Sequence, residues 1–200
     1  PKGNIYKFEY DLAGNCTKTI YPDGTSALSE YDKRGRQISA TDQAGNKTTY
    51  YYDNSNNLIS IKNAFENETK YEYSDMGNLL AVVDANGNKT EYQYDTQDRL
   101  IKTILPNGKS ISMSYDNDVN VLSSTDANGI ISKYEYDKNG NVTKQIVGSD
   151  IITYTYTANG LIKNVTNGEN CTKYEYNNLN QLTKKVLQDG VIVEYTYDIG

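Results

Sequence analysis

A tyrosine that recurs at nearly constant spacing constrains the fold of this 200-residue chain more than any other feature. Successive copies are 21 residues apart six times, 20 residues apart twice and 21 residues apart once more. Repetition at a fixed period of this length is typical of a repeat architecture. We call these ten residues the key tyrosines: Tyr10, Tyr31, Tyr52, Tyr73, Tyr94, Tyr115, Tyr136, Tyr156, Tyr176 and Tyr197.

A turn signal follows the first nine key tyrosines. Aspartate usually comes next, as Asp137 follows Tyr136, and a turn residue stands four positions after the tyrosine. Glycine and asparagine suit that position because they tolerate the positive φ of tight turns. We therefore predict structural roles for the key tyrosines and for five glycines of this turn, whereas Val119 is the one misfit. The five glycines are Gly14, Gly35, Gly77, Gly140 and Gly160.

A second turn signal divides each repeat into two halves, as in Pro22-Asp-Gly24 and Asp84-Ala-Asn-Gly87. Short segments separated by turns at intervals of about ten residues are typical of an antiparallel meander. The sequence thus predicts an all-β fold, a repetitive antiparallel β-meander of tandem hairpins. We expect residues 1–200 to form a single tandem-repeat region of about ten repeats, each 20–21 residues long.

The odd period also bears on which side chains share a face of the sheet. After a hairpin loop with an odd number of residues, even-numbered side chains stay on the same face of the sheet. After a loop with an even number of residues, they lie on the opposite face. To keep every key tyrosine on one face, we predict a three-residue loop after the tyrosine and an even loop in the second turn. The aliphatic residues at positions six and ten after the tyrosine, such as Leu79 and Val83, would then share its face, with Glu72 opposite.

The two 20-residue steps require a local exception. We predict an altered loop or a bulge near Gly148-Ser149 and another near Gly168-Glu169, since one residue is missing from each of these repeats.

The number of strands predicts the form of the sheet. Roughly 19 strands at about 4.8 Å would make a sheet some 90 Å wide, and such sheets curl because strands twist. The hydrophobic fraction is only 36%, Trp is absent and Tyr numbers 20, so a thick core is not expected. We predict a strongly curved or spiralling sheet that forms part of a hollow shell. Its edge strands would permit self-association.

Composition argues against several functions. The net charge of −6 comes without basic clusters, which disfavours nucleic-acid binding. No apolar run is long enough for a membrane span. Histidine is absent, and Cys16 and Cys171 lie far apart, so neither a His-dependent triad nor a metal motif is present. We expect no catalytic residue, cofactor or metal site, and hence no enzyme.

The recurring acidic and aromatic residues each have two interpretations. The aspartates accompany the turns, which favours turn roles over catalysis, and runs such as Asp84-Ala-Asn-Gly-Asn88 lack the closing glutamate of a calcium loop. The tyrosines either pack the wall of the sheet or stack on sugar rings. Their regular pairing with aliphatic residues favours packing.

The motif Tyr-Asp-x-x-Gly-Asn/Arg-Leu resembles the YD repeats of the Rhs family. It is seen at Tyr31-Asp-Lys-Arg-Gly35-Arg36 and, in variant form, at Tyr94-Asp95-Thr-Gln-Asp-Arg99-Leu100. Ten successive copies over essentially the whole chain make the resemblance specific. Members of this family are very large secreted or surface proteins, among them bacterial Rhs toxins, the B and C components of Tc toxins, and teneurins. The resemblance implies a spiralling β-shell around a C-terminal toxin or other effector.

The resemblance also implies the setting of the chain. We expect a fragment of a much larger secreted or cell-surface protein, with the rest of the parent shell and an encapsulated polypeptide cargo as partners. The sequence shows no shell-closing segment, self-cleaving aspartyl protease or toxin, so those functions are transferred to no residue here. The expected function is structural and non-catalytic. The alternative is a cell-surface adhesion or carbohydrate-binding module that takes glycan as its ligand.

Overall fold

The computed structural model describes residues 5–198, which contain strands and turns and no helix. They form two compact units, one made of residues up to 99 with 104–108 and the other of residues 100–103 with those from 109 onward. The all-β prediction is confirmed. No helix that could span a membrane occurs in this part of the chain.

Nine strands lie in the first unit, nine in the second, and β10 (Leu100–Ile104) has residues in both. The first unit contains β1 (Lys7–Tyr10), β2 (Cys16–Ile20), β3 (Ser26–Tyr31), β4 (Gln37–Thr41), β5 (Lys47–Tyr52), β6 (Leu58–Lys62), β7 (Glu68–Tyr73), β8 (Leu79–Val83) and β9 (Lys89–Tyr94). The second unit contains β11 (Ser110–Tyr115), β12 (Val121–Thr125), β13 (Ile131–Tyr136), β14 (Val142–Val147), β15 (Asp150–Tyr156), β16 (Ile162–Asn167), β17 (Asn170–Tyr176), β18 (Leu182–Val186) and β19 (Ile192–Glu194).

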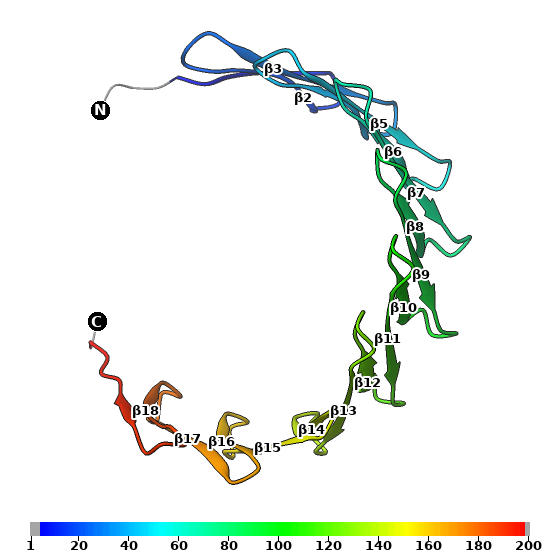
Figure 1. Ribbon diagram of the computed structural model, residues 1–200. Coiled ribbons are helices and arrows are strands. Elements are labelled where there is room, and N and C mark those ends of the chain that lie inside the picture. The colour runs from blue at the N-terminus through cyan, green and yellow to red at the C-terminus, as the bar shows by residue number, and fades with distance from the viewer. Residues whose placement is uncertain (1–4, 199–200) are drawn as a thin grey trace. The chain divides into compact units, whose positions relative to one another are not determined.

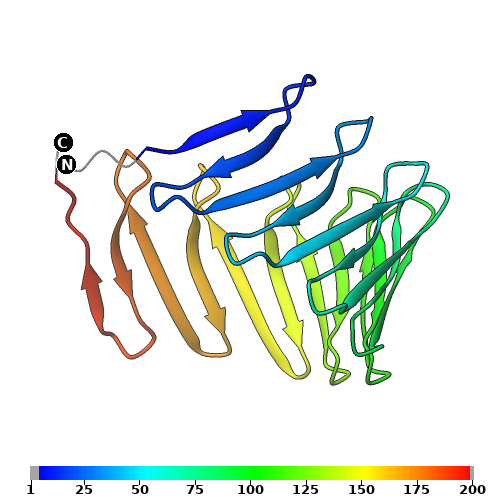
Figure 2. The same cartoon turned by 90° about the horizontal axis from the view of Figure 1, so that it is seen from above.

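Within each unit, every strand pairs antiparallel with the strands next to it in sequence, and residues 5–198 show no contact with another strand of the same unit. The strands of each unit therefore follow one another along a curved path (Figure 1), with their hairpin turns at the two ends of the strands (Figure 2). Each unit is the predicted meander, a single layer of sheet.

The turn after each of the first nine key tyrosines is a three-residue loop, as predicted. In the β13–β14 hairpin, the Asp137 N–H donates to the Asn141 carbonyl at 2.9 Å, and the Gly140 N–H donates to the Asp137 carbonyl at 3.0 Å. Gly140 has a φ of 80°, the left-handed conformation that lets the loop rejoin the ladder.

In the 21-residue repeats the second turn is a three-residue loop as well, so the prediction of an even loop there was wrong. Between β2 and β3, the Tyr21 N–H donates to the Thr25 carbonyl and the Gly24 N–H donates to the Tyr21 carbonyl, both at 2.9 Å. This is the same bonding pattern as in the first turn. Another feature must therefore keep the key tyrosines on one face although they are 21 residues apart.

A β-bulge in the first hairpin of each repeat supplies the odd residue. Tyr136 lies opposite Val142, whereas the preceding Glu135 lies opposite Lys144, so Thr143 has no counterpart. The same register shift occurs beside each key tyrosine whose hairpin pairing is described. One extra residue per repeat keeps the key tyrosines on one face across an odd period.

The bulge also changes which aliphatic residues share the tyrosine face. Leu79 lies opposite Tyr73, as predicted for position six. Val83 lies opposite Lys70, which alternates with Tyr71 and therefore faces the same way as Glu72. The prediction for position ten was wrong, because the extra residue inverts the alternation between Leu79 and Val83. The same correction applies to Ile20, Ile146 and Val186.

The two short repeats contain two-residue hairpin loops, which confirms the altered loops predicted there. Val147 pairs with Asp150 across Gly148-Ser149, and Asn167 pairs with Asn170 across Gly168-Glu169. Glycine opens each loop with a φ of 60° or 59°, as tight two-residue hairpins require.

A hydrophobic core is almost absent from the described residues. The buried side chains are Ala81 at 1% exposure, Ser39 at 2% and Ser60 at 6%, and no large side chain is fully buried. These three small residues lie on the face opposite the key tyrosines. Stability must therefore come from contacts between adjacent strands, as in repeat proteins whose units contact only their neighbours.

We predict that Val119→Gly stabilises the protein. Val119 occupies the turn position with a φ of 70°, and this conformation costs a residue with a Cβ about 1–2 kcal/mol. The flexibility of glycine in the unfolded chain offsets roughly 0.5–1 kcal/mol of the gain. The urea midpoint should rise. Val191→Gly is the control, since Val191 is also exposed but its φ is not positive, and its midpoint should fall.

Candidate functional site

The candidate site is a repeated assembly of key tyrosine, aspartate and turn, and its most regular contact is made by the tyrosine hydroxyl. Tyr136 donates its Oη–H to the carbonyl oxygen of Val121 at 2.9 Å. Val121 lies directly opposite Tyr115, at the bulge of the preceding hairpin. The same bond, at 2.7–3.0 Å, joins Tyr52 to Gln37, Tyr94 to Leu79, Tyr115 to Leu100, Tyr156 to Val142, Tyr176 to Ile162 and Tyr197 to Leu182.

This bond couples each tyrosine to the bulge of the previous repeat. A bulge disrupts the backbone ladder at one point, and a backbone carbonyl that is removed from water needs a donor. The hydroxyl of the next key tyrosine supplies that donor from the adjacent strand. Tyr10, Tyr31 and Tyr73 are the exceptions, because none of them forms this bond within residues 5–198.

The environment of the tyrosines favours their role as donors. The eight key tyrosines from Tyr31 to Tyr176 are half-buried, whereas Tyr10 is 61% exposed and Tyr197 is 45% exposed. Burial raises the pKa of the hydroxyl in five of them above its ordinary value, so these hydroxyls keep their protons. The five are Tyr73, Tyr94, Tyr136, Tyr156 and Tyr176.

The aspartate after the key tyrosine holds the turn from within. Asp137 Oδ1 accepts hydrogen bonds from the N–H groups of Asn139 and Asn141, both at 2.9 Å, and its Oδ2 accepts one from Asn141 Nδ2 at 3.0 Å. The bond from the Asn141 side chain, followed by that from the Asn141 backbone, lowers the pKa of Asp137 below its usual value. The acidic side chains of this motif therefore perform a backbone role.

The residue five positions after the key tyrosine is a functional partner that sequence reasoning did not single out. It is Asn141 in the repeat above and Arg36 in another, where Arg36 Nε donates to Asp32 Oδ2 at 2.7 Å. The signal was present in the Asn/Arg position of the motif. Asn and Arg share the ability to donate a side-chain hydrogen bond to the aspartate.

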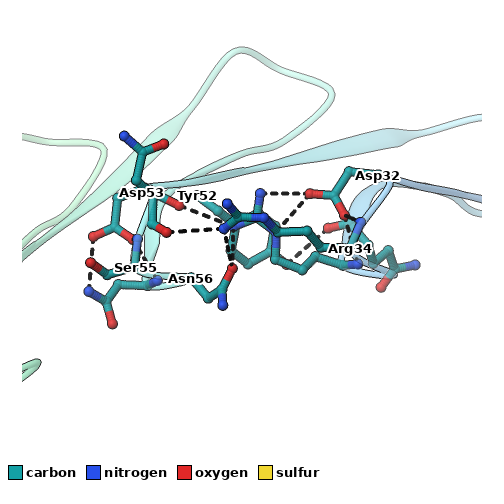
Figure 3. Close-up of polar contacts among 10 residues, drawn as sticks. Asp32, Arg34, Tyr52, Asp53, Ser55 and Asn56 are labelled. Carbon is teal, nitrogen blue, oxygen red and sulfur yellow. Dashed lines mark hydrogen bonds and ion pairs between the residues drawn. The ribbon is translucent and has the colours of Figure 1, made fainter.

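Neighbouring turns of the first unit are joined by arginines (Figure 3). Arg36 donates from Nη1 to the Asp53 carbonyl at 3.1 Å and lies 4.6 Å from the ring centroid of Tyr52. Arg34 and Arg36 both donate to Asn56 Oδ1, at 2.9 and 3.0 Å. A guanidinium over an aromatic ring is an attractive arrangement, so these contacts link one repeat to the next.

The predicted site residues are not gathered into one cluster. Gly14, Gly35 and Gly77 belong to the first unit, Gly140 and Gly160 to the second, and all five have a φ of 77–88°. Each lies in its own turn beside its own tyrosine. No group of three or more potential metal ligands occurs among the residues that the structure describes.

Comparison with known proteins gives one family and a set of solved structures. The family model for the teneurin YD-shell matches residues 1–199. The crystal structure of TcdB2-TccC3 superposes with a TM-score of 0.76 at 19% identity, over 96% of this chain and 12% of that chain. The crystal structure of TcdB2-TccC3-Cdc42 gives 0.77 at 18% identity, with the same coverage of both chains.

These comparisons show the fold of the chain. At this level of identity the solved structures share the architecture and do not transfer a role, and the chain spans only 12% of their length. No curated protein sequence matches the chain.

We predict that Tyr136→Phe lowers the free energy of unfolding by about 1 kcal/mol, the net value of a typical hydrogen bond. The ring stays, and only the bond to the Val121 carbonyl is lost. Tyr134→Phe is the matched control, because its hydroxyl makes no hydrogen bond among residues 5–198. Urea unfolding of both variants gives the comparison. Equal effects would contradict the assigned role of the Tyr136 hydroxyl.

We predict that Asp137 contributes to acid sensitivity. Its folded-state pKa lies below the unfolded value of about 3.9, so it stabilises the fold above about pH 4 and loses this contribution as pH falls through the folded pKa. Asp137→Asn should flatten the fall in the urea midpoint below about pH 4. The turn should persist, because Asn177 makes the equivalent bonds to the Leu179 and Gln181 N–H groups. An unchanged pH profile would contradict this role.

Proposed function

Because the chain belongs to the teneurin YD-shell family, we propose that it is a section of the wall of a β-shell that encloses a polypeptide cargo. In this proposal the cargo is a C-terminal toxin or another effector, and the rest of the parent protein completes the shell. The segment has no catalytic activity of its own. Residues 1–200 act as one tandem-repeat region of a large protein that is secreted or displayed on the cell surface.

The single observation that carries this proposal is a sheet that is regular without a core. No large side chain is fully buried among residues 5–198, yet every described strand within each unit is paired with its neighbours. A single-layer sheet of this kind is stable only as long as its strands stay paired. It is suited to a wall, since strands can be added at its edges without rebuilding a centre.

The key tyrosines and the five turn glycines are the structural elements of this wall. Key tyrosines such as Tyr136 bond to the bulge of the preceding repeat, and each of the five glycines closes the turn of its own repeat. Backbone pairing at the edges would let the parent shell continue in both directions. The same pairing would permit self-association of an isolated segment.

Glycan binding is the less favoured function. A ring that stacks on a sugar must present its face to solvent, whereas the key tyrosines from Tyr31 to Tyr176 are half-buried. Most of their hydroxyls already donate to backbone carbonyls, which removes them as sugar ligands. Tyr51, at 46% exposure, is the ring to test for adhesion.

Limited proteolysis of the full natural protein that contains this segment tests the proposal. We expect a polypeptide cargo that resists protease in the native protein and becomes digestible when the wall is weakened by combining Tyr115→Phe with Tyr136→Phe. Combining Tyr134→Phe with Tyr154→Phe is a control of equal composition change that leaves the bonds to the bulges intact. Equal digestion of cargo in the native protein and after denaturation would contradict encapsulation. Glycan-array binding that Tyr51→Ala abolishes would support adhesion instead.

A further inference from the structure

The chain contains six Asn-Gly pairs, a dipeptide in which asparagine can lose its side-chain amide spontaneously. The backbone nitrogen of glycine attacks asparagine Cγ, a five-membered succinimide forms, and ammonia leaves. Water then opens the ring to give aspartate or isoaspartate. Glycine favours this reaction because no Cβ hinders the attacking nitrogen and its backbone is flexible. The six asparagines are Asn86, Asn107, Asn128, Asn139, Asn159 and Asn167.

Five of these pairs lie in three-residue turns that occupy the attacking nitrogen. In each, the glycine N–H donates to the carbonyl of the residue three positions earlier. The donors are Gly87, Gly108, Gly129, Gly140 and Gly160, at 2.9–3.0 Å. The nitrogen must lose its proton and turn toward the side chain before it can attack, so this bond has to break first.

Further bonds restrain the asparagines of these turns. The backbone N–H groups of Asn86, Asn128 and Asn139 donate to the turn aspartate at 2.8–2.9 Å. Side chains are held as well: Asn159 Nδ2 donates to Asn180 Oδ1, and Lys109 Nζ donates to Asn128 Oδ1, both at 3.0 Å. Ring closure therefore has to overcome the bonds that define the turn.

The pair Asn167-Gly168 differs from the other five. Asn167 is the last residue of β16 and pairs with Asn170 of β17. Gly168 is the first residue of the two-residue loop between them. Gly168 has a φ of 59° and its N–H makes no hydrogen bond within the described part of the chain. Both residues are exposed to the water that opens the succinimide. We propose that Asn167 is the preferred site of spontaneous deamidation in this protein.

Deamidation of Asn167 disturbs the pairing of β16 with β17. Deamidation replaces a neutral amide with a carboxylate two residues from Glu169. The isoaspartyl product also lengthens the main chain by one bond at the residue that closes the hairpin opposite Asn170. The hairpin therefore becomes the place at which the sheet weakens as the protein ages.

Peptide mapping by mass spectrometry tests the site. The purified protein is held folded in mildly alkaline buffer, and conversion of each asparagine is followed over time. We expect Asn167 to convert about two to ten times faster than each of the other five, the factor that corresponds to one net hydrogen bond. A native rate at any of the five that equals or exceeds that of Asn167 would overturn the proposal.

Two controls separate the hairpin from the local sequence. In denaturant the six rates should converge, and a lead of Asn167 that is unchanged there would also overturn the proposal. Two variants create new Asn-Gly pairs. Val147→Asn precedes the other two-residue loop, in which the Gly148 N–H donates to the Ile131 carbonyl at the longer distance of 3.4 Å. Ala44→Asn precedes Gly45, whose N–H donates to the Asp42 carbonyl at 3.0 Å. The asparagine from Val147→Asn should convert faster, and the reverse order contradicts the mechanism.

Discussion

One extra residue in each first hairpin is the constraint on which the rest of the structure depends. Strand side chains alternate with a period of two, so a repeat of 21 residues would turn every second tyrosine to the opposite face. The bulge beside the key tyrosine, seen as the step from Tyr136 opposite Val142 to Glu135 opposite Lys144, absorbs that residue. The two three-residue turns can then have the same geometry, and the key tyrosines of each unit remain on one face.

The bulge has a cost that the next repeat offsets. It interrupts the backbone ladder, and the hydroxyl of the following key tyrosine bonds to the carbonyl at that point, as Tyr156 does to Val142 at 2.7 Å. A phenylalanine would fill the same space without this bond. This accounts for tyrosine in place of phenylalanine at the seven key positions that form the bond. The recurring tyrosine links adjacent repeats and therefore serves the sheet as a whole.

The two-residue loops follow the same relation between loop length, bulge and sheet face. In the β14–β15 and β16–β17 hairpins the repeat shortens to 20 residues, and the even loop combines with the bulge so that Tyr156 and Tyr176 stay on the tyrosine face. The same shortening leaves the N–H of Gly168 outside the bonding pattern of the longer turns. The deamidation proposed for Asn167 and the constant face of the key tyrosines thus both depend on the two-residue loop.

The sequence by itself determined the strands, the turns and the repeat, because turn residues such as Gly140 and alternating tyrosines such as Tyr134 and Tyr136 act locally. It also located the two altered loops, since a missing residue is visible in the spacing. Only the tertiary structure decided where the odd residue lies. A three-residue second turn with a bulge and an even second turn without one satisfy the same spacing, so Val83 was assigned to the wrong face. The partner of the Tyr136 hydroxyl was equally hidden, because Val121 lies 15 residues earlier in the chain and comes within reach only when β12 and β13 pair.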